Sequence, residues 1–501
     1  MIADALYARA AATPDRPFLL FGDRSISYAA MAALVDQAVA RFAGQGVEAG
    51  RTVAMLAGNR PGFLVAWFAL SELGAITVPI NTALVGDGLR YLLEQSEATL
   101  LVAEDEHRPD LPALGLELPV VRLDASFETM DGPPPSPRQR LALPGRTPNA
   151  ILYTSGTTGL PKGAVISNAC YAMAGEHMAA ALGLTQADRI LVFLPLFHAN
   201  PQMYGVMSCL HTGAALALLP RFSASRLLDD ARRYGATGFT YVGTVLSILA
   251  KRLDGADRDH PLRWAVGGGA PATVWRDIEE KLGIAVRELY GMTETGGWVT
   301  MNTAAAARFG SVGAPRPDTE VRVVDADDNP VPPGTKGEIV VRGRRPGLLF
   351  DGYWKKPDAT VAATANLWLH TGDRGFFDED GFLHFDGRMK ELIRRAGEMI
   401  APVEIELALL KHPLIDDCAV VGIPDDIMGE EIKAVVVARP EFDPREIPTF
   451  LHGRIPAYMI PRFVERRPAI PKTATQKVQR HLLTAPLDGD AGGLVDLRAT
   501  P

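Results

Sequence analysis

The sequence predicts an α/β protein with a large N-terminal domain, built on mostly parallel sheets plus a β-rich subdomain, and a small α+β C-terminal domain. Helical and strand patterns alternate as far as residue 194, which favours parallel sheet. From Glu320 the pattern changes to short strands separated by turns, and it changes again near Asp386. A chain of 501 residues is also too long for one ordinary hydrophobic core.

The N-terminal elements follow from hydrophobic spacing and from the positions of proline and glycine. Residues 3–43 carry the pattern of amphipathic helices, interrupted at 14–17 by two prolines. The elements that follow are a long apolar helix at 61–73, strands at 75–80, 99–102, 120–123 and 150–152, a helix at 169–182 and a strand at 190–194. The proline-rich stretch 132–138 is predicted to be a surface loop.

The C-terminal elements are shorter and more mixed. Strands are expected at 321–325 and 337–342 in the β-rich subdomain, then a helix at 402–411, strands at 417–422 and 432–438, and a helix near 447–454. We therefore divide the chain into domains 1–386 and 387–501, with a hinge near 387–391. The tail after Pro486 is rich in Gly, Asp and Ala and is predicted to be frayed.

Composition limits the class of protein. Acidic residues exceed basic ones by 59 to 51, so the net charge is −8, which does not suggest a nucleic-acid partner. Cys170, Cys209 and Cys418 lie far apart, form no disulfide framework and indicate a reducing compartment. No secretory leader opens the chain, and its most apolar stretch, 214–220, is too short to span a bilayer. We expect a cytoplasmic protein without an integral membrane segment.

The richest chemical signal is the segment Tyr153–Gly163, with the sequence YTSGTTGLPKG. Glycines let backbone N–H groups turn inward, hydroxyls add donors and lysine adds charge, so the segment is suited to cradling a polyphosphate. It lacks the Gly-Lys-Ser/Thr ending of a Walker loop. The segment therefore predicts a nucleoside triphosphate site of another type, although a plain surface turn is the alternative.

Further segments extend this signal along nearly the whole chain. They are Gly267–Pro271 (GGGAP), Tyr290–Thr295 (YGMTET), His370–Asp373 (HTGD), Gly387–Lys390 (GRMK), Gly397 and Pro471–Lys477 (PKTATQK). In this order the chain resembles the adenylate-forming superfamily, within it the AMP-forming acyl-CoA synthetases and most closely fatty-acid or carnitine-like CoA ligases. The resemblance implies a small mobile C-terminal domain and two half-reactions. A carboxylate and ATP give acyl-AMP and pyrophosphate, and a thiol then displaces AMP.

The resemblance also assigns the residues that hold the phosphates. It implies that the β- and γ-phosphates are held by Thr154, Ser155, Gly156, Thr157, Thr158 and Lys162. Glu294, together with Thr158, is the expected Mg²⁺ ligand, because a hard cation that bridges phosphates needs oxygen ligands. A helix-capping glutamate is the alternative for Glu294.

The nucleoside is assigned in the same way. The expected AMP-binding residues are Gly268, Gly269, Ala270, Pro271, Glu288, Leu289, Tyr290, Gly291, Met292, Thr293, Asp373 and Arg388. Among them Tyr290 would flank the adenine, and Asp373 would accept hydrogen bonds from the ribose, although an Asp in a Gly-Asp turn is also common.

Four positions are expected to act during the catalytic cycle. Lys477 would bridge the carboxylate and the α-phosphate during adenylation, as a point charge on the reacting oxygens. Gln476 precedes it where the family usually has glycine, which puts the reach of this lysine in doubt. Lys390 matches the hinge, and Gly397 lies where a narrow thiol arm of CoA would pass, unless it is a plain turn glycine. Thr158, Glu294, His198 and Lys477 are the catalytic candidates.

The acid is expected to bind near Phe193–Asn200, because this segment resembles the opening of the family's acyl pocket. Peptide-synthetase domains place an aspartate there for the substrate's ammonium group, and this chain has none, which argues against an α-amino acid. His198 would gate or position the carboxylate, with a structural histidine as the alternative. The other pocket candidates are Asn200, Tyr204, Tyr241, Val242, Gly243, Thr244, Gly268, Gly296, Gly297 and Trp298. These side chains carry no charge, so we expect a neutral, apolar or cyclic acyl tail.

The expected activity is ATP-dependent formation of acyl-AMP with pyrophosphate release, followed by thioester formation with CoA. ATP, Mg²⁺ and CoA are the cofactors and co-substrates that the resemblance implies. An enzyme that hands its acyl-AMP to a carrier-protein phosphopantetheine is the main alternative; luciferase-like oxidation and a non-enzymatic binding protein lack specific support. A carrier protein and a homodimer are left open as partners.

Overall fold

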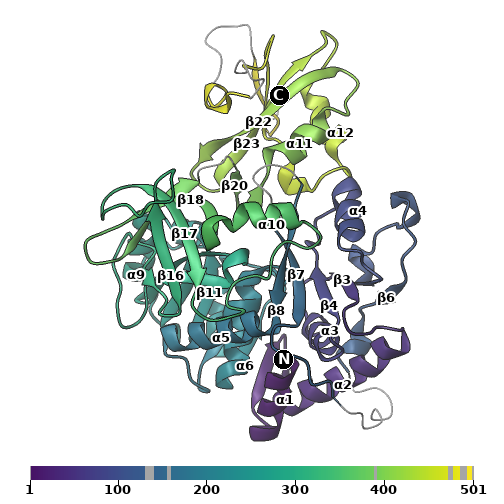
Figure 1. Cartoon of the computed structure of the whole chain (residues 1–501), viewed down its shortest axis with the longest axis vertical. Coiled ribbons are helices and arrows are strands. Elements are labelled where there is room, and N and C mark those ends of the chain that lie inside the picture. The colour runs from purple at the N-terminus through teal and green to yellow at the C-terminus, as the bar shows by residue number, and fades with distance from the viewer. Residues whose placement is uncertain are drawn as a thin grey trace.

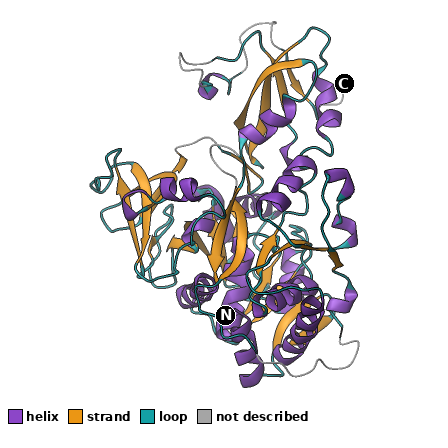
Figure 2. Ribbon diagram, turned by 45° about the vertical axis from the view of Figure 1, so that its right-hand side comes forward, coloured by secondary structure: helices purple, strands orange, loops and turns teal. Residues whose placement is uncertain are grey.

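The computed structural model describes residues 2–129, 140–154, 160–388, 392–471, 478–485 and 493–498, except for the side chain of Arg388. Residues 2–388 form a large body, and residues 392–498 form a smaller C-terminal part that stands on it, at the top of Figure 1. Helices pack around the strands of the body, and the C-terminal strands stand apart from them (Figure 2). The predicted α/β architecture is confirmed; the division after residue 386 stays a prediction.

Two largely parallel sheets support the body. In the described residues the larger has nine strands in the order β15-β14-β13-β12-β11-β9-β10-β1-β2. Its strands are β1 (Pro17–Phe21), β2 (Arg24–Ser27), β9 (Arg189–Val192), β10 (Ala215–Leu218), β11 (Gly238–Val242), β12 (Trp264–Gly268), β13 (Ala285–Met292), β14 (Gly297–Met301) and β15 (Ala314–Pro315). The second sheet has the order β6-β5-β3-β4-β7-β8, with β3 (Thr52–Leu56), β4 (Ile76–Pro79), β5 (Leu100–Ala103), β6 (Val120–Arg122), β7 (Pro148–Thr154) and β8 (Lys162–Ser167).

The helices of the body cover these sheets and bury their apolar faces. They are α1 (Ile2–Ala12), α2 (Tyr28–Gly44), α3 (Pro61–Glu72), α4 (Gly86–Gln95), α5 (Asn168–Leu182), α6 (Met207–Thr212), α7 (Leu227–Tyr234), α8 (Gly243–Arg252), α9 (Ala272–Leu282) and α10 (Pro357–Ala363). All twelve residues of α3 are buried, which explains why its sequence is apolar around the whole helix.

An antiparallel sheet of four strands forms the predicted β-rich subdomain. Its order is β16-β17-β18-β19, with β16 (Thr319–Val324), β17 (Gly337–Gly343), β18 (Leu369–Phe377) and β19 (Leu383–Arg388). The backbone of Arg388 pairs with that of Asp373 across β18 and β19. This sheet therefore brings the Gly387–Lys390 segment beside the expected ribose-binding aspartate.

The C-terminal part has its own sheet and its own hydrophobic cluster. The sheet contains β20 (Ile393–Arg395), β21 (Glu398–Ile400), β22 (Ile415–Asp425), β23 (Gly429–Ala438), β24 (Phe463–Arg466) and β25 (Leu494–Asp496). Helices α11 (Pro402–Leu409) and α12 (Ile447–Leu451) pack on it.

Two expectations were wrong. Residues 17–27 form the hairpin β1–β2 rather than helix, because β1 joins the large sheet beside β10 and buries Phe18 and Leu19 completely. The tail is not wholly frayed: β25 pairs with β24, and Asp496 binds Arg462 at 3.0 Å. The pairings with β10 and β24 join segments that are separated in the chain, whereas the hairpin itself turns at Gly22–Asp23, a local signal that the sequence analysis missed. The expected loop at 132–138 lies outside the described residues.

Candidate active site

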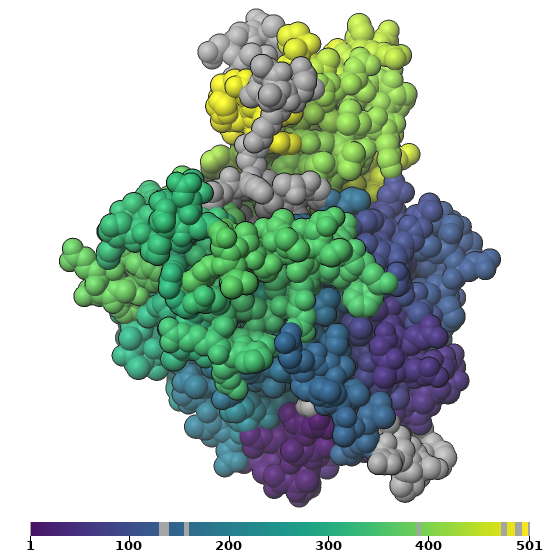
Figure 3. Space-filling model, viewed as in Figure 1, coloured from purple at the N-terminus to yellow at the C-terminus, as the bar shows by residue number. Residues whose placement is uncertain are grey.

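A cavity of about 1640 Å³ lies between the body and the C-terminal part, and both line it. In Figure 3 the C-terminal part, in yellow-green, rests on the body where the two meet. The cavity brings together segments from every region that the sequence singled out: the phosphate segment, GGGAP, YGMTET, HTGD, the Phe193–Asn200 segment and Gly397.

The phosphate segment joins the antiparallel strands β7 and β8, whose register pairs Thr154 with Lys162. Both residues line the cavity, and the Nζ atom of Lys162 lies 4.8 Å from the centre of the Tyr353 ring. The predictions for Ser155, Gly156, Thr157 and Thr158 lie outside the described residues. The described ends of the segment, Thr154 and Lys162, thus lie on the cavity wall.

Glu294 lies at this same end, in the short 3₁₀ turn η5 (Thr293–Thr295), and is 2% exposed. Its Oε1 atom accepts hydrogen bonds from the hydroxyls of Thr154 and Tyr353, each at 2.9 Å. Its buried Oε2 atom has no hydrogen-bond partner among the described residues. A buried carboxylate oxygen without a donor is costly, and a hard cation would satisfy it, so this geometry fits Mg²⁺.

The sequence analysis missed Tyr353. It reaches the site because the segment around it pairs with β8, through a bridge to Ala164, and because the backbone N–H of Phe350 donates to the carbonyl of Glu294. No periodicity marks such an added pairing in the sequence. Tyr353 therefore holds Glu294 with its hydroxyl while its ring contacts Lys162.

The expected nucleoside residues line the middle of the cavity. The Tyr290 hydroxyl donates to Oδ2 of Asp373 at 2.8 Å, and the Tyr290 ring lies 5.9 Å from that of Phe385. The cavity wall also contains Gly268, Gly269, Ala270, Pro271, Leu289, Gly291, Met292 and Thr293. The structure thus brings these predicted residues together on the wall of one cavity.

Glu288 also lines the cavity, yet protein groups already hold its carboxylate. Oε1 accepts from the backbone N–H groups of Gly269 and Ala270, and Oε2 accepts from the Tyr241 hydroxyl at 2.5 Å. Burial raises the pKa of Glu288 to about 7, and these three donors oppose the rise. We infer that Glu288 shapes the GGGAP turn instead of contacting the nucleotide directly.

The expected acyl residues divide into two sets. His198, Asn200, Tyr204, Val242, Gly268 and Gly297 line the cavity. The structure does not place the remaining candidates on this wall, namely Tyr241, Gly243, Thr244, Gly296 and Trp298. Tyr241 and Trp298 are buried, because strands β11 and β14 of the nine-stranded sheet turn these large side chains into the core.

The C-terminal part closes the cavity with the segment that carries Gly397. The carboxylate of Glu398 lies 3.1 Å from Nε2 of His198, and Nη2 of Arg394 donates to the carbonyl of Gly268 at 3.3 Å. Burial pushes the pKa of Glu398 up, but His198 more than offsets this and holds it below its usual value. Sequence reasoning missed Arg394 and Glu398, although charged residues flanking Gly397 were a signal.

Three further predicted residues are not placed. Lys390 and Lys477 lie outside the described residues, and the side chain of Arg388 is not described. Their assigned roles stay predictions.

A pH-dependent stability prediction arises from Glu404, which lines the cavity beside Glu398. Burial raises the pKa of Glu404 from 4.5 to about 7. Since the folded pKa exceeds the unfolded one, the associated stability is fully present below about pH 4.5 and is lost as pH rises through about 7. Glu404→Gln should therefore be more stable than wild type at pH 8, by up to about 3 kcal/mol, and equally stable at pH 4.

Urea unfolding at both pH values measures this difference. The exposed Glu441→Gln variant is the control and should show the same small difference from wild type at both pH values. A Glu404→Gln effect that does not change with pH would contradict the prediction.

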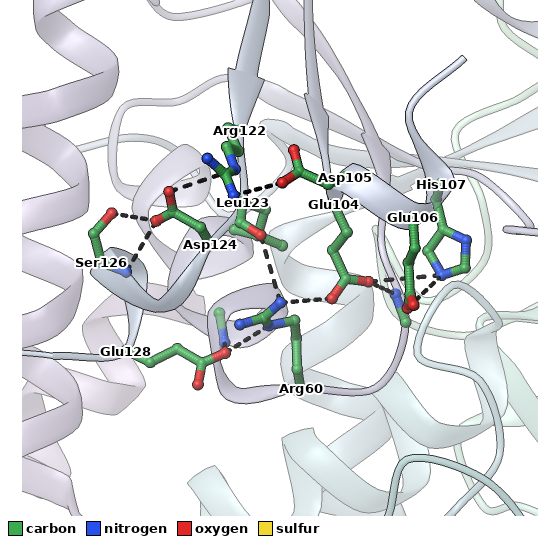
Figure 4. Close-up of polar contacts among 12 residues, drawn as sticks. Arg60, Glu104, Asp105, Glu106, His107, Arg122, Leu123, Asp124, Ser126 and Glu128 are labelled. Carbon is green, nitrogen blue, oxygen red and sulfur yellow. Dashed lines mark hydrogen bonds and ion pairs between the residues drawn. The ribbon is translucent and has the colours of Figure 1, made fainter.

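A second polar cluster, drawn in Figure 4, surrounds Arg60 at the edge of the β3–β5–β6 sheet. Glu104, Glu106 and His107 place potential ligand atoms within 4.8 Å of one another. However, Glu104 already binds Arg60 at 2.7 Å and the backbone N–H of Gly58 at 2.7 Å. Arg60 also binds Glu128 at 2.6 Å. We interpret the cluster as a structural ion-pair network.

Fold and site together define a two-part nucleotide-dependent enzyme of the adenylate-forming type. The AMP-binding enzyme model matches residues 6–354, and the AMP-binding enzyme C-terminal domain model matches residues 404–477. The chain belongs to the AMP-binding enzyme family, and it is an AMP-forming acid–thiol ligase, an acyl-CoA synthetase.

Relatives match over almost their full length. A probable CoA ligase of Humulus lupulus is 32% identical over 93% of both chains, and a sulfoacetate–CoA ligase of Cupriavidus necator is 33% identical over 96% of both. The o-succinylbenzoate CoA synthetase of Bacillus subtilis, bound to a product analogue, is 28% identical, covers 96% of this chain and 98% of its own, and has a TM-score of 0.88. The same enzyme with AMP covers 97% and 99%, at 28% identity, with a TM-score of 0.72.

The two TM-scores carry information about the arrangement of the body and the C-terminal part. The structure with the higher score is a double mutant of that enzyme holding the CoA product analogue, and the structure with the lower score holds AMP. The present chain is closer to the form with the CoA product analogue. Separately, a search of the described residues found no helix long and apolar enough to cross a membrane.

Proposed function

We propose that this acyl-CoA ligase activates a carboxylic acid with a neutral, apolar or cyclic tail, with Mg²⁺ on Glu294, and that CoA itself is the acceptor. The observation that carries the proposal is the single cavity that joins Glu294, Asp373, His198 and Gly397. The groups around Glu294 suit a polyphosphate and a cation. The groups around His198 and Gly397 suit an acyl group and a thiol. The acyl wall supports an uncharged tail, since it is built from Leu194, Pro195, Phe197, Ala199, Pro201, Tyr204, Val242 and Gly297.

In this proposal the residues act mainly by positioning and by charge. Lys162 and the phosphate segment hold the pyrophosphate that leaves, and Asp373 orients the ribose. Bound Mg²⁺, with Glu294 and Thr158 as its ligands, would neutralise phosphate charge. His198 holds the carboxylate near the α-phosphate in the first half-reaction, and in the second it turns to Glu398 as the thiol arm passes Gly397.

The second half-reaction is the one that the described arrangement favours. Glu398 and Arg394 contact the body beside Gly397, and the chain is closer to the relative that holds a CoA product analogue. A carrier-protein phosphopantetheine could use the same passage, so the acceptor has to be tested directly. A cytoplasmic setting is proposed because the three cysteines are buried and unbridged; a homodimer has no supporting observation.

The direct experiment is pyrophosphate release with a panel of carboxylic acids, with and without CoA. We expect acid-dependent release, and stoichiometric AMP and acyl-CoA only when CoA is present. Acyl-AMP that turns over only with a holo carrier protein would instead support the alternative acceptor.

Lys477→Ala tests the assignment of the adenylation lysine. We expect acyl-AMP formation to fall by about 100-fold or more, because a charge on the reacting oxygens is lost. Conversion of supplied acyl-AMP with CoA should stay within about threefold of wild type. Lys281→Ala, which removes a lysine paired with Asp277 on α9, is the control. Equal loss of both half-reactions would overturn the role.

A further inference from the structure

Tyr204 and Gly297 lie side by side on the cavity wall, among the residues expected to bind the acyl group. Tyr204 lies in the π-helical turn η4 (Pro201–Val206), a type of turn that is common at functional sites. A Cβ atom on Gly297 would lie 3.1 Å from the Tyr204 ring, so the missing side chain leaves room for the ring against β14. Tyr204 lines the cavity, and no described residue hydrogen-bonds its hydroxyl. This hydroxyl is therefore free to donate to a ligand.

Directly behind this wall lies a buried cation, Arg316, which is 1% exposed. Its guanidinium lies 5.4 Å from the ring centre of Trp298, the residue after Gly297. Nε donates to Asp318 at 2.8 Å, and Asp318 lies 2.8 Å from His177. Within the described part of the chain, Nη1 and Nη2 have no hydrogen-bond partner.

Burying a cation with unpartnered N–H groups lowers the stability of the folded state, which a purely structural role does not explain. Each buried N–H without a partner costs about 1–3 kcal/mol, and a charged one costs more. Apolar side chains of similar volume often stabilise a core better than a buried ion pair does. The arrangement is easier to explain by its effect on the neighbouring wall: burial raises the pKa of Tyr204, and the charge of Arg316 opposes that rise. Burial remains the larger effect, so the phenol is a better hydrogen-bond donor only relative to the same pocket without Arg316.

We propose that Tyr204 and Arg316 form a polar end of the acyl pocket, which selects acids carrying a neutral oxygen acceptor, such as an ether, carbonyl or hydroxyl, at the end remote from the carboxylate. Asp318 offsets the charge of Arg316, so the pair suits a neutral acceptor better than a second carboxylate. The Tyr204 hydroxyl contacts the acceptor, and Arg316 acts through Tyr204 as a positioning residue. The inference rests on the proposed function, since it assumes that the acid occupies this side of the cavity.

The test uses pairs of aliphatic and aryl acids that differ only at their far end, a methoxy group in one and an ethyl group in the other. In wild type we expect kcat/KM for pyrophosphate release to favour the methoxy acid of the best-fitting pair by at least about tenfold. Tyr204→Phe should bring this ratio within about twofold of unity while the ethyl acid is still turned over. Arg316→Met should lower the ratio by about three- to tenfold. Tyr234→Phe, whose hydroxyl binds the carbonyl of Gly22 away from the cavity, should keep the wild-type ratio.

Thermal unfolding separates this role from a structural one. Arg316→Met leaves Asp318 with His177 alone, and removing one partner of a buried ion pair is destabilising, so we expect a lower melting temperature together with the lower ratio. A lower melting temperature with an unchanged ratio would make Arg316 structural and overturn the proposal. It is equally overturned if wild type prefers the ethyl acid, shows no preference, or favours a dicarboxylate of the same length. Failure of every acid to release pyrophosphate would instead overturn the proposed function.

Discussion

Glu294→Gln is expected to slow acyl-AMP formation by about 100- to 1000-fold, the loss typical of removing one preorganised electrostatic group. Glutamine keeps an oxygen for the hydroxyls of Thr154 and Tyr353, so the local geometry should survive. The change removes the negative charge at Oε2, the buried atom that we assign to Mg²⁺. Pyrophosphate exchange measured over a range of Mg²⁺ concentrations should show a lower rate and a weaker dependence on the cation.

Tyr353→Phe is a milder change at the same site, and its effect can be compared with that of Glu294→Gln. It removes one of the two hydrogen bonds to Glu294 but keeps the charge and the ring beneath Lys162. We expect a loss of about three- to tenfold, because one hydrogen bond typically contributes about 0.5–1.5 kcal/mol net and Thr154 still donates to Glu294. Comparable losses in both variants, or an unchanged Mg²⁺ dependence in Glu294→Gln, would contradict the assignment of Glu294 as the metal ligand.

Gly397→Leu is expected to separate the two half-reactions. Gly397 has φ +89°, and a Cβ atom there would lie 2.8 Å from Cγ2 of Val242 on the cavity wall. A larger side chain would therefore obstruct the passage or hold the Arg394–Glu398 segment away from His198. Thioester formation from supplied acyl-AMP should fall by at least about 100-fold, the scale of loss produced by a misplacement of about 1 Å. Acyl-AMP formation should stay within about threefold.

Gly453→Leu is the matched control. Gly453 belongs to the same part of the chain and has φ +75°, so leucine meets similar backbone strain, but a Cβ atom there contacts nothing within 4 Å. Both half-reactions should be preserved in this variant. If it loses thioester formation as Gly397→Leu does, backbone strain rather than obstruction is responsible.

Most elements of the fold could be predicted from local pattern. Helix α3 and strands β4, β5 and β6 lie where apolar spacing places them, within the usual uncertainty of their ends. The hairpin β1–β2 was missed although its two-residue turn, Gly22–Asp23, is a local signal, whereas its pairing with β10 and the pairing of β25 with β24 join segments farther apart in the chain. Local propensity in such segments is overridden by tertiary context.

In the candidate site too, local motifs could be predicted from the sequence, and residues that depend on distant contacts could not. Motifs with an unusual local composition, such as the phosphate segment, GGGAP and YGMTET, were sufficient to predict one nucleotide cavity, and their described residues line it. Tyr353, Glu398 and Arg394 were missed, because each contributes through a single contact with a distant segment. Conversely, Tyr241 and Trp298 were expected on the wall and are buried in the core.

The sequence by itself determined the class of this protein, an α/β adenylate-forming enzyme, because phosphate and nucleotide chemistry requires particular residue types at short spacing. Only the tertiary structure decided which face of each strand meets the cavity. Side chains alternate across a strand, so Gly297 lines the pocket and its neighbour Trp298 packs against Arg316 in the core. It also decided that Arg316, whose Nη1 and Nη2 have no hydrogen-bond partner among the described residues, lies behind Tyr204, a juxtaposition of segments more than one hundred residues apart that no local pattern encodes.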